Sequence, residues 1–368
     1  MPEEKNSDNL PISGGSETIS NNPFDVRFLY LSQADVVRAG LTMKMAIEAM
    51  EKALSLFSEG KTIMPYKTVL DLDERKRGRI NAMIAYVGGE YEVAGIKWIG
   101  GFPPNVDKGW PRATALLILN DSWNGFPLAL MDSTLISAVR TGAVTGVGAK
   151  YLARPDSHSV AMIGAGVQAR TQLEALATVL HELETVRVYD PRLERAEAYA
   201  LEMKAKLGLQ VKAVGSAGEA CRGADVIVTV TVADEPIVKE AWFKEGAFFA
   251  AVGSYREEED ELVLRADKVV LDGIDHVLHR ETPIVAQLVL SGRMKREQIY
   301  AEMGEIVLGW KPGRENAKER IFYSPIGMAV DDIVLAKQVY DLAKAKGAGQ
   351  TLSLMGEKDP LHQEGVIR

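Results

Sequence analysis

The stretch SHSVAMIGAGVQARTQLEALATVLHELETVRVYD, residues 157–190, decides the fold of this chain. Its apolar run at 160–163 predicts a strand, GAGVQA at 164–169 predicts a tight turn, and apolar residues at helical spacing from Leu173 onward predict a helix. A strand, a glycine-rich turn and a helix in this order are typical of the phosphate-binding turn of dinucleotide-binding folds. We therefore interpret the stretch as the cradle of a nicotinamide dinucleotide.

The residues of the turn have separate physical roles. Gly164 allows the tight bend, Gly166 lets the backbone approach a pyrophosphate, and Ala169 lets the helix pack against its strand. Val167 and Gln168 lie in the first turn of the predicted helix, where backbone N–H groups point at a phosphate. These residues are predicted to bind the cofactor.

A second apolar strand at 186–189 ends in Asp190, about twenty residues after the turn. An acid at this place hydrogen-bonds the ribose 2′-hydroxyl of NAD and repels the 2′-phosphate of NADP. Arg192 follows shortly afterwards and offers a guanidinium that could bind that phosphate. NAD is therefore the predicted cofactor, and NADP is possible.

Composition limits the class of protein. The chain has 368 residues, 46% of them hydrophobic and 26% charged, which is typical of a soluble globular protein and long enough for two domains. Its net charge of −8 argues against a nucleic-acid partner, and its apolar runs are shorter than the roughly 18 residues of a membrane helix. The single cysteine, Cys221, fits a reducing compartment, so we expect the protein in the cytoplasm. Residues 1–24 are polar and predict a disordered tail.

The region before the turn predicts a mixed α/β domain. A strand is expected at 28–31, a helix at 43–57, and a strand-rich region at 63–130, in which Asn124-Gly125 is a hairpin signal. Residues 133–153 are rich in small side chains and predict a closely packed helix. We assign residues 25–145, together with 320–350, to a substrate-binding and dimerisation domain.

Strand and helix patterns alternate from residue 157 to about 315, which indicates βαβ units and a parallel sheet with helices on both faces. The predicted fold class is therefore α/β, with a Rossmann-type, doubly wound domain over 146–319. The segment that starts at Phe322 is expected to begin with a turn and to continue as a long helix that returns to the first domain. The residues after Gly349 are expected to be loose.

Lys97 is a candidate catalytic residue because it is the only charged residue between Glu92 and Asp107, in a strand-like apolar segment. An ammonium buried there without a partner would have a lowered pKa or cost several kcal/mol. Both outcomes suit a lysine that holds substrate or moves a proton. The alternative is a lysine on an edge strand that reaches water.

Arg140 is the second candidate, because the chain has no acidic residue between Asp132 and Asp156. A helical Arg140 therefore has no carboxylate at i,i+3 or i,i+4. Its guanidinium is expected to bind the carboxylate or phosphate of a ligand. A long-range structural salt bridge is the alternative.

Two other groups of residues give weaker signals. The acidic run at 257–261 is most simply explained as a solvated loop. His276 and His279 have i,i+3 spacing but no fuller ligand set, so no metal site is predicted. The chain has no HExxH, GxSxG or P-loop motif, so nothing in it supports zinc hydrolysis, serine hydrolysis or phosphoryl transfer.

Several stretches resemble the ornithine cyclodeaminase/mu-crystallin family over roughly residues 28–345: GIKWIGGFPPN, PRATALLILND, LISAVRTGAVTGVGAKYLA, IGAGVQA, GADVIVTVT and SPIGMAVDD. The resemblance implies a Rossmann domain, a nicotinamide cofactor and a substrate domain that forms a homodimer through its sheet. It puts Lys97 and Arg140 at substrate-contacting positions. It also implies cofactor contacts at Thr141, Thr229, Val230, Thr231, Gly253 and Ser254.

The chain departs from the family's cyclodeaminases at three places. Ser254 and Tyr255 stand where these enzymes have an aspartate, Tyr66 or Lys67 replaces an arginine, and Asn81 replaces a glutamate. We expect Lys67, Asn81 and Ser254 in the substrate site. The missing carboxylates argue against ornithine as the substrate.

These observations predict an NAD(P)-dependent oxidoreductase that acts on the Cα–N bond of an amino acid or its imine, with Lys97 and Arg140 as its catalytic residues. Two alternatives remain: an ornithine cyclodeaminase that regenerates its NAD, and a non-catalytic, crystallin-like dinucleotide-binding protein. A small-molecule substrate and a second copy of the chain are the predicted partners, with no nucleic acid and no membrane.

Overall fold

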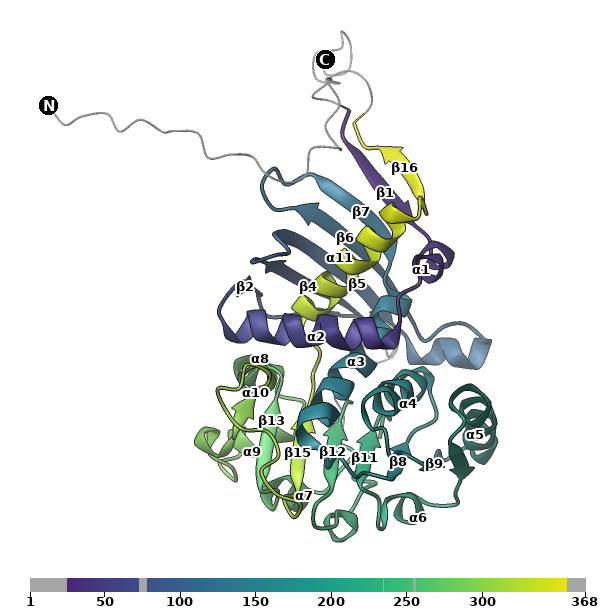
Figure 1. Ribbon diagram of the computed structural model, residues 1–368, viewed down its shortest axis with the longest axis vertical. Coiled ribbons are helices and arrows are strands. Elements are labelled where there is room, and N and C mark those ends of the chain that lie inside the picture. The colour runs from purple at the N-terminus through teal and green to yellow at the C-terminus, as the bar shows by residue number, and fades with distance from the viewer. Residues whose placement is uncertain (1–24, 73–77, 234, 254–255, 356–368) are drawn as a thin grey trace, which may run out of the picture.

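The chain folds around two sheets, one above the other in Figure 1. The structure is a computed structural model that describes residues 25–72, 78–233, 235–253 and 256–355. The predicted tail at 1–24, Ser254 and Tyr255 lie outside the described residues. None of the described helices is long and apolar enough to cross a membrane.

The first sheet is mixed and mostly antiparallel, as the strand-rich pattern predicts. In the described residues its strands lie in the order β16 (Gln350–Ser353), β1 (Arg27–Leu31), β7 (Pro127–Asp132), β6 (Ala113–Asp121), β5 (Val93–Gly101), β4 (Arg79–Val87) and β2 (Thr62–Ile63), and β3 (Thr68–Asp71) also pairs with β4. The hairpin prediction is confirmed, because β6 and β7 pair antiparallel and Gly125 between them has a φ of 75°. That positive φ is the conformation that favours glycine in a tight turn.

Three helices cover one face of this sheet: α1 (Gln33–Ala39), α2 (Met43–Ser58) and α11 (Ala329–Ala345), with α2 and α11 in front of the strands in Figure 1. Ser32 caps α1, since its side chain accepts a hydrogen bond from the backbone N–H of Asp35. Strand residues that point to the helices, such as Met83 and Leu117, are buried. Their neighbours on the opposite face, such as Ile84 and Trp98, are exposed although they are apolar.

The small-residue helix is α3 (Thr134–Leu152), which joins the two halves and packs against α4 (Val167–Val179). The close approach of α3 to α4 depends on Gly142, because a Cβ there would lie 2.5 Å from the backbone oxygen of Thr171 in α4. The two helices could not keep this distance with a larger residue.

The second sheet is parallel throughout, which confirms the Rossmann-type prediction. Its strands lie in the order β10 (Gln210–Ala213), β9 (Thr185–Tyr189), β8 (Ser159–Ile163), β11 (Val226–Thr229), β12 (Phe248–Ala251), β15 (Ile321–Ser324), β13 (Lys268–Leu271) and β14 (Ala301–Glu302). The central strands are buried along their whole length, as expected of a parallel sheet with both faces covered.

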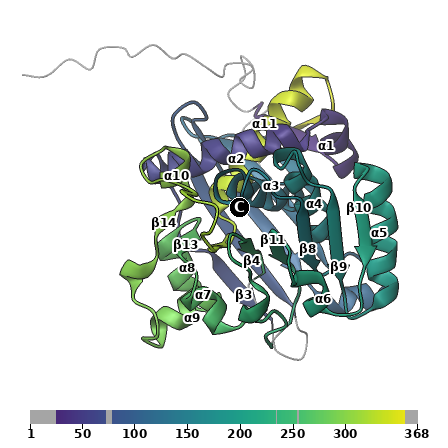
Figure 2. The same ribbon diagram turned by 60° about the horizontal axis from the view of Figure 1, so that its bottom comes forward.

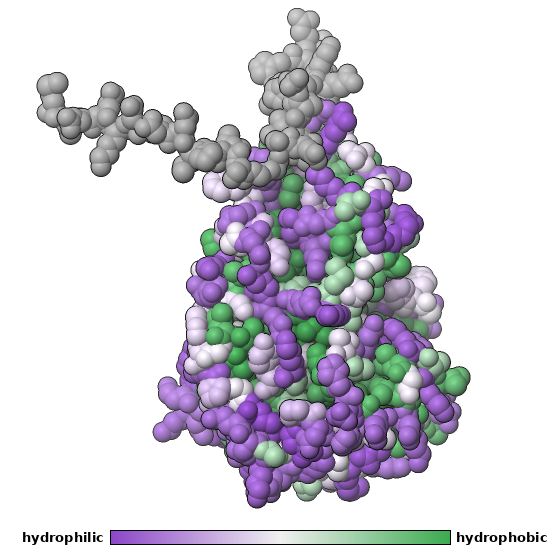
Figure 3. Space-filling view, in the orientation of Figure 1, coloured by the Kyte–Doolittle hydropathy of each residue, from purple (hydrophilic) through white to green (hydrophobic). Residues whose placement is uncertain are grey.

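Helices cover both faces of the parallel sheet: α4, α5 (Leu193–Leu207), α6 (Ala217–Cys221), α7 (Asp260–Leu264), α8 (Ile274–Arg280), α9 (Ile284–Leu290) and α10 (Met303–Val307). Short 3₁₀ turns lie at Pro103–Lys108, Glu240–Trp242 and Arg296–Gln298. Figure 2 shows α5 beside β10 at one edge of the sheet and α8 and α9 near β13 toward the other. On the face seen in Figure 3, hydrophilic residues predominate over this half of the molecule.

Two predictions about the end of the chain are wrong. Phe322 lies in β15, between β12 and β13, so the chain returns to the first sheet only after Ser324 and not at residue 320. Residues 350–353, directly after Gly349, form β16, which pairs with β1, while residues 356–368 lie outside the described residues. Both strands are short and are stabilised by partners far away in sequence, so local patterns do not indicate them.

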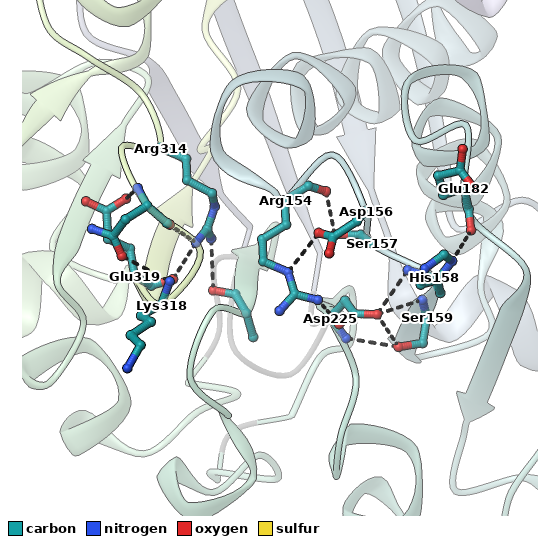
Figure 4. A network of polar contacts seen from close by, with 12 residues as sticks. Arg154, Asp156, Ser157, His158, Ser159, Glu182, Asp225, Arg314, Lys318 and Glu319 are labelled. Carbon is teal, nitrogen blue, oxygen red and sulfur yellow. Dashed lines mark hydrogen bonds and ion pairs between the residues drawn. The ribbon is translucent and has the colours of Figure 1, made fainter.

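A polar network ties the amino end of β8 to the end of α3 (Figure 4). Asp225 accepts hydrogen bonds from the backbone N–H groups of His158 and Ser159, both at 3.0 Å, and from the Ser159 hydroxyl at 2.7 Å. It also forms a 2.9 Å ion pair with Arg154. The network therefore stabilises the end of the sheet opposite the carboxyl ends of the strands.

Candidate functional site

A cleft of about 210 Å³ lies beyond the carboxyl ends of β11, β12 and β15. Ligands of open α/β sheets bind at this edge, next to the point where the strand order reverses. Here the order reverses between β8 and β11. The cleft is therefore where the fold itself predicts a ligand.

Many of the predicted cofactor and substrate residues meet in this cleft: Arg140, Thr141, Gln168, Val230, Thr231 and Gly253. Thr229 ends β11 directly before them and is buried. The lining also includes Arg112, Val144, Val252, Pro325, Ile326 and Gly327, which the sequence did not single out.

The glycine-rich turn has the geometry that a dinucleotide needs. Gly164 has a φ of 103°, and a Cβ there would approach the Val230 oxygen to 3.0 Å. Gly166 is the N-cap of α4, and no side chain caps the helix. The first amides of α4 can therefore donate to a phosphate. Ala169 is fully buried, and the side-chain oxygen of Gln168 is buried without a hydrogen-bond partner among the described residues.

Asp190 lies at the end of β9 and is buried. Its carboxylate accepts hydrogen bonds from the backbone N–H of Ala165 at 3.1 Å and of Arg192 at 3.0 Å. Arg192 is exposed at the start of α5, and Val167 is exposed in the first turn of α4. Asp190, which is predicted to bind the ribose, thus also stabilises the glycine-rich turn through its hydrogen bond with Ala165.

Asp332 joins the two candidate catalytic residues. One of its carboxylate oxygens lies 2.6 Å from Nζ of Lys97, and the other lies 3.2 Å from Nε of Arg140. Asp331 lies 4.0 Å from the same guanidinium, and Nζ of Lys97 also donates to the Ser137 hydroxyl at 3.2 Å. A lysine from β5, an arginine from α3 and acids from α11 therefore meet in one buried group.

Burial changes the proton affinity of this group. It lowers the pKa of Lys97 to about 8, against the opposing effect of Asp332. It raises the pKa of Asp331 to about 7, although Arg140 opposes the change. Two groups in contact with the site thus titrate near neutral pH, as catalytic acids and bases do.

Lys97 and Arg140 are both buried beside Asp332. The Lys97 side chain is 1% exposed on an interior strand, so it does not reach water as an edge-strand lysine would. Arg140 has no carboxylate at i,i+3 or i,i+4, but Asp332, which is far away in sequence, supplies one in the folded chain. The long-range salt bridge exists, and Arg140 still lines the cleft.

The two other predicted substrate residues lie on the first domain. Asn81 is in β4, and its side-chain oxygen is buried without a hydrogen-bond partner in the described chain. Lys67 lies between β2 and β3 and is half-buried. Burial, together with the charge of the neighbouring Arg280, lowers the pKa of Lys67 to about 7.

The acidic run is only partly a solvated loop, which corrects the prediction. Glu257 is fully buried and accepts a 2.6 Å hydrogen bond from the backbone N–H of Thr231, a residue of the cleft. Glu258 is 1% exposed, and burial raises its pKa well above the ordinary range. Glu261 is exposed. A run of acids gives no local signal that distinguishes its buried members.

The two histidines of α8 pack against an aromatic ring. His279 stacks on Tyr66 with the ring centres 3.9 Å apart, and His276 contacts the same ring edge-on at 5.0 Å. The described residues contain no group of three or more His, Cys, Asp or Glu side chains placed to hold a metal.

Asp331 and Asp332 are the members of this buried group that sequence reasoning missed. Acids in the first turn of a helix are common because they interact favourably with the helix dipole. Their sequence context therefore has an ordinary explanation. Only the contact with Lys97 and Arg140, far away in sequence, indicates another role.

Comparisons with known proteins find similar sequences and similar solved structures. N-((2S)-2-amino-2-carboxyethyl)-L-glutamate dehydrogenase of Staphylococcus aureus is 34% identical over 89% of this chain and 98% of its own length. Delta(1)-pyrroline-2-carboxylate reductase of Thermococcus litoralis, solved with NADH and L-proline, is 38% identical with a TM-score of 0.82, over 88% of this chain and 99% of its own. An archaeal alanine dehydrogenase, solved as a dimer with bound NAD, is 34% identical with a TM-score of 0.82, over 89% and 100%.

The sequence profile of the ornithine cyclodeaminase/mu-crystallin family matches residues 29–347. This range includes the glycine-rich turn, Lys97, Arg140 and the aspartates of α11. The chain belongs to the ornithine cyclodeaminase/mu-crystallin family.

Proposed function

We propose that this protein is an NAD-dependent oxidoreductase that interconverts an amino acid and its imine at the Cα–N bond. The observation that carries the proposal is the buried group in which Asp332 joins Lys97 and Arg140, beside a cleft with a dinucleotide-binding turn. The relatives named above include amino-acid dehydrogenases and an imine reductase.

Each side chain has a defined task in this reaction. Arg140 lines the cleft and binds the substrate carboxylate, while Asp332 fixes the direction of its guanidinium. Lys97 accepts the proton that the substrate amine loses on oxidation and returns it on reduction. Orientation within the cleft is the main contribution of the protein.

The reaction balances without another reagent. NAD, when bound, would supply the acceptor for the hydride of Cα, and the electrons of the N–H bond would form the C=N bond. Lys97 accepts the proton, so an amino acid and NAD give an imine, NADH and one proton. In the reverse direction, the imine would take back the hydride from NADH and the proton from Lys97.

The first test is a screen of the purified protein with NAD and NADP against amino acids, and with NADH and NADPH against cyclic imines and pairs of 2-oxo acids and amines. Net change in the absorbance of the reduced nicotinamide is the expected result. Ammonia and proline from ornithine without net NADH would instead identify a cyclodeaminase. Cofactor binding without turnover on the whole panel would favour a non-catalytic protein.

We also propose that two copies form a homodimer through the open face of the first sheet. Apolar side chains in register on β4, β5 and β6 are exposed there: Ile84 at 46%, Trp98 at 47%, Leu116 at 50% and Ile118 at 39%. An exposed apolar patch of this kind is typical of a protein interface. The single cysteine and the nicotinamide cofactor fit a cytoplasmic location.

A further inference from the structure

Three cations lie next to the catalytic group, on the side of the first domain and α8. We name Lys67, Arg79 and Arg280 the cationic wall. Lys67 lies between β2 and β3, Arg79 is the first residue of β4, and Arg280 is the last residue of α8. They come from three separate segments, so the tertiary structure brings them together.

Contacts between these segments place the wall at the cleft. The Tyr66 ring stacks on His279 of α8 at 3.9 Å, which holds Lys67 close to Arg280. Nη1 of Arg280 donates a 2.6 Å hydrogen bond to the backbone oxygen of Ile326, a residue of the cleft lining. The next residue, Gly327, is in contact with the Arg140 guanidinium.

The buried carboxylates near Lys67 and Arg280 already have other partners. Asp331 and Asp332 interact with Arg140 and Lys97. Asp272 accepts hydrogen bonds from the backbone N–H of Gly327 at 2.9 Å and of its own neighbour Gly273 at 3.0 Å. Among the described residues, no carboxylate lies within ion-pair distance of a side chain of the cationic wall.

Lys67 and Arg280 are half-buried, whereas Arg79 is exposed and lies opposite Asp71 in the pairing of β3 with β4. A half-buried cation that no side-chain carboxylate contacts is costly. This cost lowers the pKa values of Lys67 and Arg280. Burial, followed by the charges of Arg280 and Arg79, lowers the pKa of Lys67 to about 7. Burial also lowers the pKa of Arg280 to about 10, although the nearby charge of Asp272 opposes this change. A ligand anion between them would offset this cost and gain charge-assisted hydrogen bonds.

The carboxylate at Cα of an amino acid is bound by Arg140 in the proposed function, so the wall is available for a different group. We infer that the cationic wall binds a second carboxylate, carried by the substrate side chain, and that this protein prefers acidic amino acids and their 2-imino dicarboxylates. The inference rests on the proposed function, because it assigns a substrate class to that same cleft.

The test compares acids with their isosteric amides: L-glutamate with L-glutamine and L-aspartate with L-asparagine. The ratio of kcat/KM for acid to amide is expected to be at least about tenfold in the wild type, because a charged hydrogen bond is worth that much or more. Arg280→Gln should lower the ratio at least tenfold, mainly through KM. Arg296→Gln is the matched control, since Arg296 is exposed and paired with Asp275 outside the cleft, and its ratio should equal that of the wild type.

If Arg280→Gln does not fold, Lys67→Gln tests the same inference. Burial and the neighbouring cations already disfavour the charge of Lys67, so its removal should leave the fold intact. It should also lower the ratio. A wild-type ratio near one, or a ratio that neither variant changes, would overturn the inference.

A binding measurement separates this inference from the proposed function. Calorimetric titration of the protein with NADH should give tighter binding of succinate or glutarate than of butyrate or pentanoate, and Arg280→Gln should remove the difference. Tighter binding of dicarboxylates without turnover would contradict the proposed function and support a second carboxylate site at the cationic wall. Turnover with equal binding of mono- and dicarboxylates would support the proposed function and refute that second carboxylate site.

Discussion

Lys97, Arg140 and Asp332 explain how the site can be both stable and reactive. A buried lysine alone would lose its proton, and a buried aspartate alone would gain one. Here one carboxylate contacts both cations, at 2.6 Å and 3.2 Å, so each charge stabilises the other. The Lys97 pKa still falls to about 8, which allows this residue to exchange a proton near neutral pH.

Lys97→Met is expected to lower kcat by about 10²–10⁴-fold, which is the usual contribution of a general acid or base. NAD binding, measured by calorimetry, should stay unchanged, because Lys97 is not part of the dinucleotide turn. Lys206→Met, at an exposed pair with Glu174, serves as the control. If Lys97→Met lost both NAD binding and turnover, Lys97 would have a structural role instead.

The pH dependence follows from the same pKa. Oxidation needs neutral Lys97 as the proton acceptor, so kcat/KM for the amino acid should rise with pH and level off above about 8. Imine reduction needs the protonated form and should fall over the same range. Profiles in both directions that are flat between pH 7 and 9 would exclude Lys97 as the acid–base group.

At the scale of elements, α3 determines the geometry of the site. It carries Arg140 and Thr141 into the cleft and packs against α4, the helix of the dinucleotide turn. Gly142 allows this contact, and Gln172 of α4 donates a 3.1 Å hydrogen bond to the backbone oxygen of Thr141. A change in the distance between α3 and α4 therefore changes the substrate site and the cofactor site together.

Gly142→Ala is expected to destabilise the protein by about 1–3 kcal/mol, because its Cβ would overlap the backbone of Thr171, which cannot move independently. Gly146→Ala is the matched comparison in the same helix. Its nearest contact is the flexible end of Ile47 at 3.0 Å, so the gain in helix propensity largely offsets the crowding. Thermal unfolding monitored by circular dichroism measures both variants, and equal melting temperatures would contradict the role of Gly142.

At the scale of the whole molecule, the two sheets are covered differently. The parallel sheet has helices on both faces, whereas the first sheet has α1, α2 and α11 on one face and exposed apolar residues on the other. The site lies where the two halves meet, so the first sheet supplies Lys97 and the parallel sheet supplies the turn. The open face remains available for a second copy of the chain.

Leu116→Glu is expected to convert the proposed dimer to a monomer, because it puts a charge on each side of an apolar interface. Val37→Glu is the control, since Val37 is 61% exposed but lies on α1, away from that face. Sedimentation velocity measures the mass of both variants. A monomeric wild type, or a dimer that survives Leu116→Glu, would refute the interface.

The sequence by itself determined the fold class, the parallel sheet and the dinucleotide turn, and it singled out Lys97 and Arg140 as candidates. These features depend on local patterns: periodic apolar residues, glycines at a turn, and charges that are conspicuous in an apolar segment. Most strands and helices follow the same patterns and were predictable. The hairpin at Asn124-Gly125 is an example.

Only the tertiary structure decided which groups act on one another. Asp332 lies 235 residues from Lys97 in the sequence and 2.6 Å from it in space. The burial of Glu257, the pairing of β16 with β1 and the position of Arg280 beside Lys67 depend in the same way on distant segments. Charge pairing and burial are properties of the packed chain, because the free energy of a buried charge depends on neighbours that no local pattern names.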